Sequence, residues 1–243
     1  MERLDKFIAD RGDLSRRDAQ KLIKGGEVTV DGAVCRQPDR KVDESSAVSV
    51  RGQAVSGEKF VYIMLNKPAG VVSATEDRRD RTVIDILPKE YRRRGLFPAG
   101  RLDKDTEGLL ILTNDGDFAH RMLSPKKHVP KTYIASVDGA ITQDMIRRFE
   151  EGVVFADGTR CLPAKLENIT KNDNYVARVT ICEGKFHQVK KMFATCGLNV
   201  VHLQRISVGN LYLDSNLPIG CCKYLTNLEI KQVFIGNIHE NKD

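Results

Sequence analysis

The chain has 243 residues, of which 41% are hydrophobic and 30% are charged, and its formal net charge is +6. This composition is typical of a globular protein that is long enough for one large domain or for a large and a small one, and a modest positive charge suggests a polyanionic partner. No apolar run approaches the roughly 20 residues that a membrane-spanning helix needs, and the start MERLDKFIAD lacks the apolar core of a signal peptide, so a cytoplasmic protein without membrane contact is expected.

The first 57 residues are predicted to form a small separate module. Ser15 and the pair Gly25 and Gly26 bracket a helix over residues 16–24, with Asp18 completing a box-like N-terminal cap. The stretches EVTVDGAVC and AVSVRGQAV each alternate apolar residues around a turn signal, which predicts two strand–turn–strand units. A short polar linker at residues 58–60 is expected to end the module.

The predicted helix gathers its cations on one face. At about 100° per residue, one side of the helix carries four of them, namely Arg16, Arg17, Lys21 and Lys24. A solvated surface helix is one interpretation. A phosphate-binding face is the favoured one, because protein surfaces normally mix charges of both signs.

This first segment has a recognisable pattern. RLDKFIADRGDLSRRDAQKLIKGGEVTVDGAVC resembles an S4 domain, the small RNA-binding module of ribosomal protein S4 and of many RNA-modifying enzymes. The R-L-D-K-F start, the S-R-R cluster and the G-x-V-x-V-D-G hairpin carry the resemblance. The resemblance implies that the cationic helix face contacts RNA.

Residues 61–235 are predicted to form a larger domain, followed by a tail at 236–243. Strands are expected within FVYIMLNKPAGVVSA, LLILT, KTYIASVDG, CLPAKLENI, NYVARVTIC and VVHLQRISVGNLYL. Helices are expected over DFAHRML with Asp117 as its cap, over TQDMIRRFEEG, and over residues 187–196. Because strands and helices do not alternate regularly, we expect an α+β fold with a mixed, largely antiparallel sheet and flanking helices.

A basic stretch follows the first strand of this domain. Residues 78–101 hold eight basic and three acidic residues, with clusters at Arg78, Arg79 and Arg81 and at Arg92–Arg94. Such a stretch is expected to attract RNA phosphates. For Arg92–Arg94 a solvated loop is an equal alternative.

The stretch GRLDKDTEGLLILTNDG, residues 100–116, places acidic residues beside an apolar strand. A calcium loop begins in a similar way, but Ile111 and Asn114 occupy its ninth and twelfth positions, where ligands belong. NDGD is a turn signal, and Asp105 and Glu107 fit a loop. Asp103 differs, because a carboxylate at the edge of a core needs a partner, and one paired with a cation stays ionised and can act as a nucleophile or base.

Metal and cofactor motifs are missing from the sequence. The six cysteines form no C-x-x-C pair, and no two of the five histidines have H-x-x-x-H spacing. The chain also has no P-loop and no G-x-G-x-x-G motif. We therefore expect reduced thiols, no bound metal and no cofactor.

GRLDKDTEGLLILTNDGDFAHRML is similar to the signature G-R-L-D-x-x-T-x-G-L-L-L-L-T-N-D-G of the pseudouridine synthases of the small-subunit rRNA type. LNKPAG at 65–70, KTY at 131–133 and EGKFHQVKKMFATCG at 183–197 match further family segments in the same order. The resemblance implies the pseudouridine synthase fold. It also implies a reaction in which the glycosidic C–N bond of uridine is cleaved, the base rotates, and a C–C bond forms at C5.

The resemblance also implies roles for individual residues. Asp103 matches the essential aspartate, Lys190 lies where related families carry an arginine that pairs with it, and Tyr133 matches a tyrosine that stacks on the uracil. Arg101 is expected to orient the flipped nucleotide and Lys191 to contact RNA phosphate. Surface lysines and a core tyrosine are the competing interpretations. Candidates for structural or substrate contacts are Lys67, His187 and Gln188.

The leading prediction is a monomeric enzyme that isomerises one uridine of small-subunit (16S) rRNA, free or in a small-subunit assembly intermediate. MERLDKFIAD and the short stretch after LTNLEIKQV resemble the small-subunit enzymes. The alternatives are a large-subunit (23S) rRNA pseudouridine synthase and a non-catalytic RNA-binding factor for ribosome assembly. Whether Asp103 attacks C1′ or C6, or removes the 2′ proton, stays open.

Overall fold

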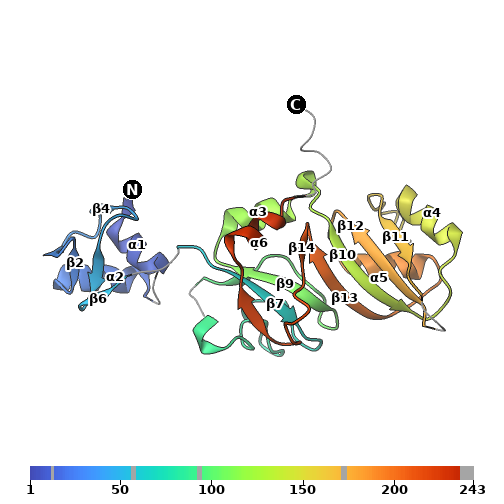
Figure 1. Ribbon diagram of the computed structural model, residues 1–243, viewed down its shortest axis with the longest axis horizontal. Helices are drawn as coiled ribbons and strands as arrows, with labels where there is room; N and C mark the ends of the chain where they lie inside the picture. The colour runs from blue at the N-terminus through green and yellow to red at the C-terminus, as the bar shows by residue number, and fades with distance from the viewer. Residues whose placement is uncertain (12–13, 56–58, 92–94, 171–173, 236–243) are drawn as a thin grey trace. The chain divides into compact units, whose positions relative to one another are not determined.

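The computed structural model describes residues 1–11, 14–55, 59–91, 95–170 and 174–235 (Figure 1). Its internal contacts divide the chain into two units, one of Met1–Val61 with Glu90–Leu96 and one of Tyr62–Lys89 with Phe97–Asp243. The predicted tail at 236–243, the Arg92–Arg94 cluster and residue 58 of the predicted linker lie outside the described residues.

Two helices and two hairpins form most of the first unit. Helix α1 (Leu4–Arg11) packs against α2 (Arg16–Gly25), and both contribute to a core that includes Leu4, Phe7, Ile23 and Val28. Helix α2 begins and ends where its caps predict. The hydroxyl of Ser15 accepts a hydrogen bond from the backbone N–H of Asp18, and Gly26 takes φ +80° at the C-terminus.

The hairpins of this unit follow from their turn residues. Strand β2 (Val28–Val30) pairs with β3 (Ala33–Val34) and with β5 (Val48–Val50), which in turn pairs with β6 (Gln53–Ala54). Asp31 and Gly32 have φ +54° and +82°, and Arg51 and Gly52 have +50° and +78°. Positive φ at both central residues is what a tight two-residue hairpin turn requires. A further short pair joins β1 (Glu2–Arg3) to β4 (Lys41–Val42).

A mixed nine-stranded sheet runs through the second unit, which confirms the predicted fold class. Its central order is β11-β12-β10-β13-β9-β7-β15, with β14 beside β13 and β8 beside β9. The strands are β7 (Tyr62–Lys67), β8 (Phe97–Pro98), β9 (Glu107–Thr113), β10 (Lys131–Val137), β11 (Lys165–Asn168), β12 (Val176–Ile181), β13 (Val200–Val208), β14 (Leu211–Tyr212) and β15 (Cys222–Tyr224). All of these pairs are antiparallel except β9 with β13, which is parallel.

The parallel step between β9 and β13 depends on one glycine. Gly108 lies opposite Arg205 with φ +97°, and a Cβ atom there would come within 2.2 Å of the Arg205 carbonyl oxygen. Glycine alone lets the two backbones approach this closely. The contact matters because β9 begins directly after the acidic loop that contains Asp103.

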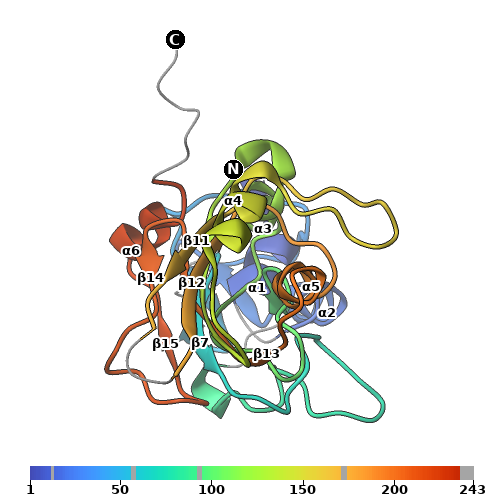
Figure 2. The ribbon, with the colours of Figure 1, turned by 90° about the vertical axis from the view of Figure 1, so that its right-hand side faces the viewer.

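Within the described residues, four helices flank the sheet. Helix α3 (Gly116–Leu123) and α6 (Asn227–Gln232) lie near the β7–β9 end, where the rings of Phe118 and Phe234 are 5.3 Å apart. Helix α4 (Gln143–Glu151) contacts β11, and α5 (Gln188–Thr195) contacts β13 (Figures 1 and 2). Short 3-10 turns cover Lys89–Tyr91 and Pro125–Lys127. No helix among the described residues is long and apolar enough to cross a bilayer.

The cap of α3 corrects the sequence-based assignment. We predicted Asp117 as the cap of DFAHRML, but the carboxylate of Asp115 accepts the backbone N–H groups of Asp117 and Phe118. Asp115 also accepts a hydrogen bond from the Tyr62 hydroxyl on β7. The helix therefore starts earlier than predicted and is joined to the sheet at its first turn.

Candidate active site

Asp103 lies in a tight loop between β8 and β9. Gly100 turns the chain with φ +90°, Leu102 is buried, and the backbone N–H of Thr106 donates to the carbonyl of Asp103 at 3.1 Å. The loop is thus closed on itself before β9 begins at Glu107. A buried residue on one side and a hydrogen-bonded turn on the other thus hold the backbone of Asp103 in place.

The segment after β7 is hydrogen-bonded to this loop. The Ser73 hydroxyl donates to the Leu102 carbonyl at 2.9 Å and accepts the Leu102 N–H at 3.0 Å. The N–H of Gly70 donates to the Lys104 carbonyl at 2.7 Å. Gly70 of the predicted LNKPAG segment and Ser73 just beyond it therefore hold the backbone on the two sides of Asp103.

Lys67 is the main support of the loop and is fully buried. Its ammonium lies 2.8 to 3.3 Å from four backbone carbonyl oxygens, those of Pro68, Asp103, Lys104 and Thr106. An ammonium has three protons, so these carbonyls share them. Burial lowers the pKa of Lys67 to about 8, which still leaves the group mostly protonated at pH 7. The sequence analysis named Lys67 only as a candidate for a structural or substrate contact. Its position in the N-K-P motif was the one sequence feature that pointed to it.

A histidine and a lysine flank the carboxylate of Asp103. His187 Nε2 is 3.5 Å from Oδ1 and Lys190 Nζ is 3.8 Å from Oδ2. Lys190 lies closer to Asp105, at 2.5 and 2.7 Å from its two carboxylate oxygens, and this hydrogen bond lowers the pKa of Asp105. Our prediction named Asp103 as the partner of Lys190. The structure places Lys190 between the two carboxylates, with its shorter contacts to Asp105.

His187 and Gln188 line the pocket opposite the Asp103 loop and differ in their contacts. His187 takes φ +51° at the residue before α5, a conformation that is uncommon for a residue other than glycine. The Gln188 side chain is buried, accepts the Lys185 N–H at 2.9 Å and donates to Glu183 at 2.7 Å. Gln188 is therefore a structural residue, whereas His187 faces Asp103.

One pocket joins four of the predicted site residues. Arg101, Asp103, Tyr133 and Lys190 all line it, together with His187 and further residues of β13, α5 and the preceding loop. Tyr133 lies on β10 and is only 8% exposed, as expected for an aromatic residue of the core. It also lines the pocket, as expected for a residue that stacks on the base. Arg101 is exposed at the same pocket.

Lys191 points elsewhere. Its ammonium lies 5.7 Å from the ring centre of Phe155 and 5.1 Å from that of Phe186, in both cases over the ring. Lys191 is not among the residues that line the pocket with Asp103. Successive residues of a helix point about 100° apart, which accounts for the different surroundings of Lys190 and Lys191.

The cationic face of α2 belongs to the first unit and is exposed as predicted at Arg16, Arg17, Lys21 and Lys24. Arg16 is less free than its neighbours, because its guanidinium is 3.2 Å from the carboxylate of Asp5. Asp5 is fully buried, and hydrogen bonds from Arg3, Gln20 and Arg16 hold its pKa well below the ordinary value despite burial. Arg16 therefore helps to close the core of its own unit.

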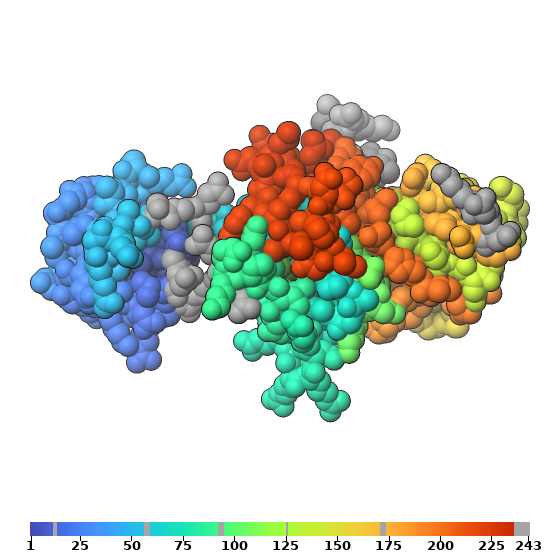
Figure 3. All heavy atoms as spheres, turned by 60° about the horizontal axis from the view of Figure 1, so that its bottom comes forward, coloured from blue at the N-terminus to red at the C-terminus, as the bar shows by residue number. Residues whose placement is uncertain are grey.

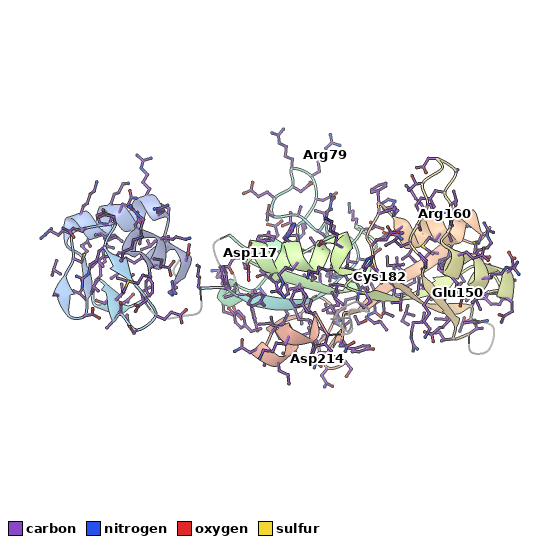
Figure 4. All side chains as sticks on the ribbon, turned by 90° about the horizontal axis from the view of Figure 1, so that it is seen from above. Arg79, Asp117, Glu150, Arg160, Cys182 and Asp214 are labelled. Carbon is purple, nitrogen blue, oxygen red and sulfur yellow. The ribbon has the colours of Figure 1, made fainter. Side chains whose placement is uncertain are left out.

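The basic loop with Arg78, Arg79 and Arg81 projects from the second unit. Figure 4 shows Arg79 at its outer end, and in Figure 3 the teal loop stands out from the surface. All three arginines are exposed. Asp80 of this loop pairs with Lys104 at 2.6 Å, which connects the basic loop to the loop that carries Asp103.

Two family models match the chain. The family model for RNA pseudouridylate synthase matches residues 61–195, and the model for the S4 domain matches residues 2–48. The uncharacterized RNA pseudouridine synthase YtzG of Bacillus subtilis is 48% identical over 94% of this chain and 96% of its own length.

Two relatives named for different ribosomal subunits match almost equally. The ribosomal large subunit pseudouridine synthase B of Bacillus subtilis is 40% identical, over 96% of both chains. The ribosomal small subunit pseudouridine synthase A of Vibrio parahaemolyticus is 41% identical, over 96% of this chain and 99% of its own. A crystal structure of a pseudouridylate synthase superimposes with a TM-score of 0.67 at 35% identity, covering 96% of this chain and all of that one.

Proposed function

The chain belongs to the RNA pseudouridylate synthase family, and on this premise we propose that it isomerises one uridine of small-subunit rRNA to pseudouridine, with Asp103 as the reacting carboxylate. The two sequence resemblances are confirmed, and the protein is a pseudouridine synthase with an N-terminal S4 domain. Its relatives are named for both ribosomal subunits, so identity alone supports an rRNA substrate and not one subunit.

The observation that carries the proposal is the pocket shared by Asp103, Tyr133 and Lys190. A carboxylate that acts on a ribose or a base must be ionised, and His187 Nε2 and Lys190 Nζ lie 3.5 and 3.8 Å from its two oxygens. In our proposal the uridine leaves its stack, which costs a few kcal/mol, and its uracil lies against the Tyr133 ring. Arg101 at the same pocket then holds the phosphate of the flipped nucleotide.

The isomerisation leaves the elemental composition of the uridine unchanged. The glycosidic bond between C1′ and N1 breaks, the uracil rotates within the pocket, and a bond forms between C1′ and C5. The proton on C5 then leaves to solvent through a base, and N1 takes up a proton, so the composition is unchanged. The step is redox-neutral. The chain has to supply a carboxylate, a place for the rotating base and the exclusion of water, and buried Tyr133 and Leu102 contribute to the last of these.

Carbodiimide labelling with primer extension tests the proposal. The isomerisation does not change the mass of the RNA, but the carbodiimide forms a stable adduct with pseudouridine that stops primer extension. Small- and large-subunit rRNA from cells with and without the gene should differ at one site in the small-subunit RNA. A site in the large-subunit RNA would refute the subunit assignment and keep the activity. Identical patterns in both RNAs, together with an inactive purified protein, would refute the proposed reaction.

Lys190→Met is expected to lower kcat by roughly 10- to 100-fold with little change in KM, because the cation between the two carboxylates is removed. Lys191→Met is the matched variant and should raise KM while kcat stays nearly constant, since Lys191 does not line the pocket with Asp103. Release of tritium from C5-labelled uridine in rRNA measures both constants. The reverse pattern would exchange the roles of the two lysines.

The S4 unit is proposed to bind rRNA through α2. Changing Arg17, Lys21 and Lys24 to Ala should weaken RNA binding and reduce the slope of log Kd against log salt by about one for each phosphate that the protein no longer neutralises. Arg16 is left unchanged, because its pairing with buried Asp5 supports the core. Fluorescence anisotropy of labelled rRNA fragments over a salt series provides the slope. An unaltered slope would identify these three cations as a solvated surface.

The remaining parts of the proposal concern the setting of the enzyme. We propose a monomer that acts in the cytoplasm, where rRNA is assembled, on free rRNA or on a small-subunit assembly intermediate. Residues 1–57 serve as the RNA-binding domain and residues 61–235 as the catalytic domain. Size-exclusion chromatography with light scattering and fractionation on sucrose gradients address the oligomeric state and the bound particle.

A further inference from the structure

A large aromatic side chain stands exposed beside the pocket. Phe186 is 72% exposed, although it lies between Lys185 and His187, both of which line the pocket with Asp103. Placing a phenylalanine in water forfeits the stabilisation that its burial would give. Single exposed apolar residues are common, so exposure needs support from the surroundings of the ring.

The ring is held in place by its neighbours. It stacks on the imidazole of His187 with 3.8 Å between ring centres and 21° between planes. The backbone around it is a closed turn, because the N–H of Gln188 donates to the Lys185 carbonyl at 3.1 Å and the Gln188 side chain accepts the Lys185 N–H. His187 covers part of one face of the ring and the Lys191 ammonium lies over the ring at 5.1 Å, but the exposure of 72% shows that much of the side chain still faces solvent.

The charge beside the ring is positive. Lys191 lies over Phe186 at 5.1 Å, and its amine makes no ion pair with a carboxylate among the residues that the structure describes. An exposed aromatic surface next to a cation is the combination with which proteins bind single-stranded nucleic acids, since the bases stack and the cation meets phosphate. An apolar protein partner would match this charge less well.

We propose that Phe186, supported by His187, is a second base subsite that stacks an unpaired nucleobase next to the target uridine. The proposal rests on the proposed function, because it assumes that the uridine occupies the pocket at Asp103. His187 then separates two bases, with its imidazole near the carboxylate of Asp103 and its stacked partner Phe186 facing the neighbouring nucleotide. The enzyme would therefore select uridines whose neighbour is also unpaired, in a loop or an opened helix.

Four proteins test the subsite: the wild type, Phe186→Ala, Phe186→Trp and the control Tyr212→Ala. Tyr212 is 64% exposed and lies on β14, so its replacement removes an exposed aromatic ring of the same unit that does not line the pocket with Asp103. Each variant is tested for binding of a fluorescein-labelled twelve-residue oligouridine and for turnover of rRNA transcripts. The oligouridine measurement does not depend on catalysis.

Phe186→Ala should raise both Kd for the oligouridine and KM about tenfold, which corresponds to about 1.4 kcal/mol, with kcat within about twofold of wild type. Phe186→Trp should retain wild-type values, and Tyr212→Ala should change neither constant. The salt dependence of Kd should be parallel for Phe186→Ala and wild type, because stacking releases no counterions. Thermal unfolding should also be unchanged, since the ring is exposed.

A Kd and KM of Phe186→Ala within twofold of the wild type would overturn the subsite, as would an equal loss of affinity in Tyr212→Ala. Retention of binding by Trp and loss by Ala distinguishes stacking from a general change of the surface. If the wild type binds the oligouridine through Phe186 but makes no pseudouridine in any transcript, the proposed reaction fails and the base subsite stands.

Discussion

Asp103→Asn is expected to abolish pseudouridine formation and to leave folding and RNA binding intact. The substitution preserves size and removes only the charge and the basicity of one oxygen. Loss of a reacting side chain commonly lowers kcat by about 10⁴-fold or more, so single-turnover formation should fall below detection. The fold should persist, because Lys67 and Thr106 contact the backbone carbonyl of Asp103 and not its carboxylate.

The comparison requires an aspartate outside the site. Asp117→Asn changes an exposed carboxylate on α3 that does not line the pocket, and it should keep wild-type kcat. Tritium release from C5-labelled rRNA and binding of the same RNA provide the two readouts. Appreciable turnover by Asp103→Asn would assign the chemistry to another residue.

The same variant tests the non-catalytic alternative. In cells lacking the gene, Asp103→Asn would restore normal ribosomal subunit profiles if RNA binding alone were the function. Failure to restore them, with wild-type protein succeeding, assigns the cellular effect to the modification. Rescue by both proteins, with carbodiimide stops restored only by wild type, would show an assembly function beside the enzymatic one.

Lys67→Met is expected to lower kcat by about 10²-fold, the effect of misplacing a reacting group by about 1 Å. Methionine has a similar length but donates no hydrogen bonds, so the carbonyls of Asp103, Lys104 and Thr106 lose a shared donor. Two effects on stability oppose each other. Unpaired carbonyls destabilise the fold, whereas removing a buried charge relieves its desolvation, and the net decrease in the free energy of unfolding should be about 1 to 3 kcal/mol.

Lys131→Met is a closely matched control. Lys131 is also buried, burial likewise lowers its pKa to about 8, and its ammonium donates to the carbonyls of Met122 and Val129, away from the Asp103 loop. Both variants should be less stable in urea unfolding, but only Lys67→Met should have a lower kcat. An equal decrease of kcat in both variants would mean that Lys67 supports the fold in general and not the position of Asp103.

Local features of the fold were predictable because neighbouring residues in the chain determine them. Ser15 and Gly26 define the ends of α2, and the dipeptides Asp31-Gly32 and Arg51-Gly52 form the two hairpin turns. Helix α1 escaped prediction, since eight residues are too few for a stable isolated helix and its formation depends on packing against α2. Asp117 was wrongly preferred to Asp115 as the cap of α3, because both precede the same apolar run.

The sequence by itself therefore determined the family and singled out Asp103, since both follow from one contiguous signature. The order of the predicted strands and helices determined the fold class. The tertiary structure decided which groups face one another. Lys190 and Asp105 are 85 residues apart, and Lys67 is 36 residues from Asp103, so their contacts follow from the packing of distant segments. Burial decided the role of Lys67, because an ammonium removed from water must find carbonyl oxygens, and those of the Asp103 loop are the ones it reaches.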